Sequence, residues 1–197
     1  MKKVLVFIVL TFGVMSCSDR QTNKELTVEG LKTDIQQIDD SLKMLYDKAR
    51  ETENFNIAHE VYFEAIARNK SFYEHFPNDE FAETALNKIA AMYFQLNMEG
   101  EASKWRDTLL NKFPTTKNKA TLMELQMSYY GNDESFSQEM IEYYGNELLK
   151  IDGLSEEKKE EIKFRIAHSD KTFMQLIEYQ IMNEEGGMDE NSADFSL

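Results

Sequence analysis

The stretch that decides the fold is residues 78–114, which read NDEFAETALNKIAAMYFQLNMEGEASKWRDTLLNKFP. Its first half places apolar residues three or four positions apart, which aligns side chains on one face of a helix. These residues are Ala82, Leu86, Ile89, Tyr93 and Leu96, and a second row of Phe81, Ala85, Met92 and Phe94 widens the face. After a turn predicted at 97–100, a narrower row predicts a second helix that ends at Pro114, because proline lacks the N–H that continues a helix. The stretch therefore predicts an antiparallel helical hairpin whose broad first helix needs cover on two sides.

The sequence supplies a similar neighbour for this hairpin. A shift of 37 residues places five residues of the preceding segment onto five of this one. They are Ala65, Phe72, Tyr73, Phe76 and Pro77, which fall on Ala102, Leu109, Leu110, Phe113 and Pro114. One hairpin of this size cannot bury its broad helix alone, so we expect hairpins stacked on one another.

The small and large residues of the central hairpin resemble the pattern of the tetratricopeptide repeat. The matching residues are Leu86, Ile89, Ala90, Tyr93, Ala102, Leu109 and Pro114. The spacing of 37 residues between equivalent positions is three residues longer than in the common tetratricopeptide repeat of 34 residues. This longer spacing is similar to that of envelope lipoproteins, including the tetratricopeptide subunit of the outer-membrane β-barrel assembly machine. The resemblance implies an all-α fold, a short tetratricopeptide-like α-solenoid of six or seven helices. It also implies a concave groove for a partner, which the first helix of the hairpin would line with Thr84, Asn87, Ala91 and Phe94.

Helical patterns continue on both sides of the central hairpin. An earlier row predicts the first helix of the domain and comprises Leu31, Ile35, Ile38, Leu42, Leu45 and Ala49. Four polar residues are predicted to cap later helices: Asn56, Thr115, Ser135 (with Gln138) and Ser155. The last apolar region fits one helix or two helices separated at 168–170, and we favour a continuous or slightly bent helix. The helical repeat domain is thus predicted at 29–183, followed by a disordered acidic tail at 184–197.

The N-terminus has the plan of a bacterial lipoprotein signal. Lys2 and Lys3 precede an apolar run that stops at Cys17, the only cysteine in the chain. The three residues before Cys17, which are Val14, Met15 and Ser16, resemble a lipobox. We therefore predict a signal peptide at 1–16, cleavage between Ser16 and Cys17, and lipidation of Cys17. A flexible tether is predicted at 17–28. The alternative is an ordinary signal in which Cys17 is incidental. Acyl chains contribute ~0.8 kcal/mol per buried methylene, so lipidation predicts a protein held on a membrane. Ser18 stands where an Asp would resemble an inner-membrane retention signal, which favours the outer membrane, with the protein facing the periplasm.

The composition narrows the classes of partner. The chain of 197 residues has a formal net charge of −14, with 8 glycines and 2 prolines. Binding to nucleic acid rests on neutralising phosphates with lysine and arginine, so we expect no nucleic-acid partner. Anionic lipid surfaces are disfavoured for the same reason, which leaves the N-terminal lipid as the predicted contact with the membrane.

No reactive motif is recognisable in the sequence. The three histidines, His59, His75 and His168, lack the short paired spacing of a zinc site, so we predict no metal and no cofactor. The acid pairs at 156–157 and 160–161 lie in a highly charged segment, where a solvated helix face is the ordinary explanation. We therefore predict that the protein is not an enzyme and has no catalytic residues.

Five aromatic doublets remain after these exclusions: 62–63, 72–73, 93–94, 129–130 and 143–144. Neighbours on a helix point about 100° apart, so one member of a doublet often faces outward. The favoured hypothesis is a protein–protein adaptor or scaffold in the cell envelope, used in outer-membrane or envelope assembly. The alternative is an envelope binding module for a small polar ligand or glycan, in which tyrosines stack on sugar rings: Tyr129, Tyr130, Tyr143 or Tyr144. A third hypothesis, a hydrolase, requires a deep pocket with two inward carboxylates.

Overall fold

The structure is a computed structural model that describes residues 26–186, and within this range it contains eight helices and no strand. The helices are α1 (Val28–Thr52), α2 (His59–His75), α3 (Ala82–Gln95), α4 (Glu99–Lys112), α5 (Lys119–Tyr129), α6 (Gln138–Leu148), α7 (Glu156–Ala167) and α8 (Phe173–Gly186). The all-α prediction is confirmed, although the count exceeds the six or seven helices expected. No helix in the described range is both long and apolar enough to cross a bilayer.

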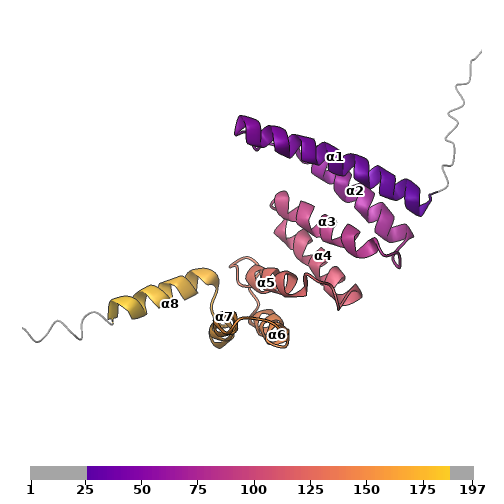
Figure 1. Cartoon of the computed structure of the whole chain (residues 1–197). Helices are drawn as coiled ribbons and strands as arrows, with labels where there is room; N and C mark the ends of the chain where they lie inside the picture. Colours follow the sequence, from indigo (N-terminus) through magenta and orange to yellow (C-terminus); the bar gives the residue numbers. More distant parts are fainter. Residues whose placement is uncertain (1–25, 187–197) are drawn as a thin grey trace, which may run out of the picture.

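Helices α1 to α7 are stacked in chain order. Each consecutive pair from α1 and α2 to α6 and α7 is in contact, and the stack runs from α1 at one end to α7 at the other (Figure 1). Contacts between sequence neighbours are the defining feature of an α-solenoid, in which every hairpin is covered by the next. The predicted solenoid arrangement is therefore present.

The 37-residue repeat is visible in the backbone. Phe76 and Phe113 each close a helix by donating an N–H to the carbonyl four residues earlier, at 2.8 Å in both cases. Their dihedral angles are nearly equal, with φ −133° and ψ 56° for Phe76 and φ −126° and ψ 68° for Phe113. The N–H of Asp79 then donates to Phe76, as that of Thr116 does to Phe113, at 3.1 and 3.0 Å. The two connections α2–α3 and α4–α5 are thus copies of one structure.

The core follows the predicted apolar rows, with the correction that Phe94, predicted to widen the covered face, is exposed, and that Leu45 and Phe81 are half-buried. In α1 the buried residues are Leu31, Ile35, Ile38, Leu42 and Ala49. In the central hairpin, six of the seven residues that carry the tetratricopeptide resemblance are buried: Leu86, Ile89, Ala90, Tyr93, Ala102 and Leu109. Pro114 is exposed and begins the connection to α5.

The turn between α3 and α4 is shorter than predicted. Asn97 adopts the left-handed conformation with φ 56°, and its N–H donates to Phe94 while that of Met98 donates to Tyr93. This paired arrangement is a Schellman-type helix end, which asparagine tolerates better than most residues. Glu99 and Gly100, predicted as turn residues, therefore lie in the first turn of α4.

Two predicted helix caps are wrong. Helix α2 begins at His59 without a side-chain cap, because Asn56 belongs to a separate turn in which its N–H donates to the Asn54 side chain at 3.1 Å. Helix α5 begins at Lys119, several residues after Thr115, because residues 113–118 repeat the 76–81 connection. Tertiary repetition, rather than the nearest polar residue, sets this second boundary.

A third predicted cap is displaced by two residues. The N-cap of α6 is Ser137, whose hydroxyl accepts from the N–H of Met140 at 3.3 Å. The Ser135 hydroxyl instead donates to the carbonyl of Tyr129, which closes the loop after α5. Ser155 is confirmed as the cap of α7 and accepts from the N–H of Lys158 at 3.2 Å.

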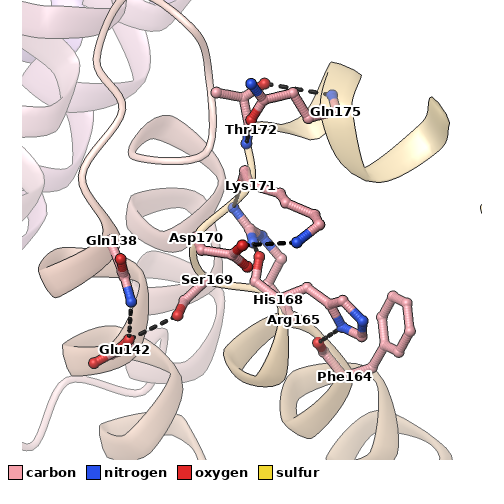
Figure 2. A network of polar contacts seen from close by, with 10 residues as sticks. All are labelled: Gln138, Glu142, Phe164, Arg165, His168, Ser169, Asp170, Lys171, Thr172 and Gln175. Carbon is pink, nitrogen blue, oxygen red and sulfur yellow. Dashed lines mark hydrogen bonds and ion pairs between the residues drawn. The ribbon is translucent and has the colours of Figure 1, made fainter. Parts of the chain in front are cut away.

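The favoured continuous last helix is also wrong, because the chain breaks between α7 and α8. Arg165 is buried, and its guanidinium donates to the carbonyls of His168 at 2.7 Å and Lys171 at 2.9 Å (Figure 2). These two hydrogen bonds stabilise a non-helical conformation of the link between α7 and α8, residues 168–172. Thr172 and Gln175 then exchange side-chain and backbone hydrogen bonds in a capping box that starts α8.

Helix α8 extends away from the stack (Figure 1). Its first residue, Phe173, contacts Arg165 of α7 and donates its N–H to the carbonyl of Gly131 at 2.9 Å. Beyond this start, the backbone of α8 lies close to no other helix in the described part of the chain, and much of its surface is exposed. Its backbone remains helical to Gly186, so the helix enters the stretch predicted as the acidic tail. The signal peptide, Ser16, Cys17 and most of the tether, together with the tail from 187, lie outside the described residues.

Candidate binding groove

The four residues predicted to face a groove lie on one side of α3. Thr84, Ala91 and Phe94 are exposed, and Asn87 is half-buried. Phe94 is the largest of them, and 49% of its surface is exposed. Its neighbour Tyr93 is buried, so this aromatic doublet divides between core and surface as expected.

A small apolar hollow of about 160 Å³ lies between this face of α3 and helix α5. Asn87, Ala91 and Phe94 line it from α3, whereas Thr84 does not reach it. The opposite wall is formed by Leu122, which is buried, and Leu125, which is 37% exposed. We call this hollow the α3–α5 groove; its walls are aromatic and aliphatic, as is typical of a site for an apolar side chain.

Arg106 of α4 lies at the base of the α3–α5 groove. It lines the hollow although only 2% of its surface is exposed. One guanidinium nitrogen, Nη2, donates to the Glu99 carboxylate, and Nε has no hydrogen-bond acceptor. A buried donor without a partner costs about 1–3 kcal/mol.

Sequence reasoning missed Arg106, Leu122 and Leu125 as groove residues. Apolar residues at helical spacing in this region form one row, made of Ala120, Met123, Met127 and Tyr130, and the two leucines fall outside that row. The sequence pattern that could have identified Leu122 and Leu125 is their place on the side of the helix opposite its apolar row. The pattern for Arg106 is weaker, and consists of a charged residue at a position where the repeat is otherwise buried.

Two of the other aromatic doublets divide in the same way, whereas Tyr73 is half-buried beside buried Phe72 and both Tyr129 and Tyr130 are half-buried. Phe63 and Tyr143 are exposed at 46% and 53%, and their neighbours Tyr62 and Tyr144 are buried. The tyrosines proposed to stack on sugars are not equivalent. Tyr130 and Tyr144 stack on one another with ring centroids 6.1 Å apart and an interplanar angle of 12°. Of the four tyrosines, Tyr143 is the most exposed.

The titratable residues considered in the sequence lie at helix ends and surfaces. The Nδ1 atoms of His75 and His168 lie 2.7 and 2.9 Å from carbonyls four residues earlier, at the ends of α2 and α7. The acids of α7 are exposed and form ion pairs within the helix, such as Lys159 with Glu156 at 2.7 Å. Within residues 26–186, no three acidic, histidine or cysteine side chains form a group that could hold a metal ion.

Comparisons with known proteins add no relative to this description. No protein-family model, no curated protein and no solved structure matches the chain.

Proposed function

We propose that the protein is an adaptor that holds another protein at the cell envelope through the α3–α5 groove. The observation that carries the proposal is the groove itself, with an exposed Phe94 on its rim and a buried, incompletely paired Arg106 at its base. Exposed aromatic side chains and arginines are the residues that most often dominate the energy of protein interfaces. The matching partner segment carries an apolar side chain that fits between Phe94 and the leucines of α5.

The proposal includes the location predicted from the N-terminal residues. Lipidation of Cys17 would hold the stack of helices close to the outer membrane on its periplasmic side. An adaptor benefits from such a tether, because two proteins confined to one surface meet at a high effective concentration. The proposed partner is therefore another envelope protein.

Co-purification from native membranes tests the proposal. The full-length tagged chain is compared with Phe94→Glu in the groove and with Phe63→Glu on α2, a matched exposed aromatic residue. Both substitutions lie on the surface, so we expect each to change the free energy of unfolding by less than about 0.5 kcal/mol. A stoichiometric protein partner should be recovered with the wild type and Phe63→Glu and lost with Phe94→Glu.

Two results would contradict the proposal. Either no stoichiometric partner is recovered with the wild-type chain, or the partner is recovered equally well with Phe94→Glu. Circular dichroism of both variants establishes that neither has lost its helices.

A further inference from the structure

A second hollow, distinct from the α3–α5 groove, opens where α4, α5 and α6 meet. It has a volume of about 450 Å³ and shares no lining residue with the groove. This is within the range of roughly 300–1,000 Å³ that small-molecule sites occupy. Its polar and aromatic lining consists of Asp107, Asn111, Lys119, Tyr143, Tyr144 and Glu147. We call it the α4–α6 pocket.

The carboxylate of Asp107 is held in a fixed position at this pocket. Its Oδ1 atom accepts from the Nε2 atom of Gln126 and from the hydroxyl of Tyr144. Gln126 is fully buried, and its Nε2 also donates to the carbonyl of Ser103 at 3.2 Å. Burial, and next the hydrogen bond to Asp107, raise the pKa of Tyr144, so its hydroxyl stays protonated and donates. A carboxylate has about four acceptor sites, so Asp107 keeps capacity for a ligand.

A tyrosine ring stands beside this carboxylate. Tyr143 is 53% exposed and packs edge-on against Tyr144, with centroids 5.0 Å apart and an interplanar angle of 75°. Tyr144 is itself buried and stacked on Tyr130, so the support beneath Tyr143 is rigid. The pocket therefore presents an aromatic ring and a prepositioned acceptor to the same space.

We propose that the α4–α6 pocket binds a neutral or amino sugar. A sugar ring has an apolar face of C–H groups that fits the Tyr143 ring, and an edge of hydroxyls that can donate to Asp107. Hydrogen bonds from hydroxyls to a carboxylate are stronger than those between neutral groups. The carboxylates of Asp107 and Glu147 disfavour uronic acids and other anionic sugars through charge repulsion.

The chemistry of the walls also separates this site from the protein-binding groove. The α3–α5 groove has mostly apolar walls, whereas the α4–α6 pocket combines aromatic rings with a cation, an amide and two carboxylates. The sugar proposal therefore does not depend on the proposed protein partner.

Titration by nuclear magnetic resonance tests the inference, and it uses the full-length protein in its unlipidated form. The probes are N-acetylglucosamine disaccharide, glucosamine, cellobiose and, as the anionic comparison, digalacturonic acid. Each is added up to about 10 mM, tenfold above a dissociation constant of about 1 mM. The variants are Tyr143→Ala, Tyr143→Phe and Asp107→Asn, and Tyr179→Ala on α8 is the control for loss of an exposed tyrosine.

The inference expects saturable binding of at least one neutral or amino sugar, with digalacturonic acid bound more weakly. Tyr143→Ala should weaken binding about tenfold or more, equivalent to about 1.4 kcal/mol. Tyr143→Phe, which keeps the ring, and Tyr179→Ala should leave it unchanged, and Asp107→Asn should weaken it. No binding of any neutral or amino sugar, or binding that Tyr143→Ala leaves intact, would overturn the inference. Binding of short peptides in place of sugars at this pocket would do the same.

Discussion

At the scale of single residues, close packing between neighbouring hairpins is decided by a few small side chains. Gly145 of α6 faces α7, and a Cβ atom placed on it would lie 2.6 Å from Cγ1 of Ile166. Gly100, at the start of α4, is a useful contrast, because a Cβ there meets its first neighbour at 3.4 Å. The same substitution should therefore have opposite effects at the two sites.

Gly145→Ala should destabilise the protein by about 1–3 kcal/mol, the usual cost of overpacking a core. Gly100→Ala should be neutral or stabilise by up to about 1 kcal/mol, because alanine is the better helix former and restricts the unfolded chain. Urea unfolding measures both. Equal effects of the two substitutions would mean that α6 and α7 are not packed as described.

The carboxylate of Asp79 makes the stability of the fold depend on pH. Its carboxylate accepts from the N–H of Phe81 at 2.9 Å and pairs with Lys32 at 3.0 Å, and these two contacts lower its pKa below the ordinary 3.8. A lowered folded-state pKa stabilises the fold above the unfolded-state pKa, and this contribution is lost as pH falls through the folded-state value.

Asp79→Asn should therefore destabilise the protein at neutral pH, and the difference from wild type should shrink as the pH falls below 3.8 and through the lowered folded-state pKa of Asp79. Urea unfolding at several pH values provides the measurement. Glu134→Gln, which alters an exposed acid in the α5–α6 loop, serves as the control. A difference between Asp79→Asn and wild type that is constant across this pH range would refute the assignment.

At the scale of elements, the sequence predicted helices well and their ends poorly. The apolar row of α1 could be read directly, because one helix face carries all the information. The break before α8 could not, because it depends on Arg165 reaching two carbonyls that lie beyond its own helix. The groove was half predictable for a similar reason. Asn87, Ala91 and Phe94 follow from the repeat, whereas Leu122 and Leu125 enter only because α5, which packs against α4, forms the other wall of the hollow.

The link between α7 and α8 is organised around the side chain of Arg165. In addition to its two hydrogen bonds to carbonyls, Arg165 lies 5.2 Å from the centroid of the Phe173 ring. Ser169 in the same link donates to Glu142 of α6 at 2.7 Å (Figure 2). Lysine has no planar fork and cannot reproduce both bonds. Arg165 therefore fixes the direction in which α8 leaves the stack.

Arg165→Lys should accelerate amide hydrogen exchange in the link at 168–172 and in α8, with little change in α1 to α4. Lys163→Arg, an exposed cation on the same helix, is the control and should leave exchange unchanged. Hydrogen exchange with mass spectrometry resolves these segments. Unchanged protection of α8 in Arg165→Lys would show that the joint does not depend on the guanidinium.

At the scale of the whole molecule, the stack explains why an apolar groove is left on a well-packed protein. Each hairpin covers the broad face of its neighbour, yet α3 and α5 are separated in the chain by α4 and leave the hollow above Arg106 between them. The formal net charge of −14 keeps the remaining surface soluble and discourages association between copies.

The most direct test of this account is photo-crosslinking in living cells. A photoreactive phenylalanine analogue replaces Phe94 in the α3–α5 groove, or Phe63 on α2 as the matched position outside it. The account predicts one dominant crosslinked envelope protein from position 94 and none of that product from position 63. An absence of crosslinks at position 94, or the same products from both positions, would contradict it.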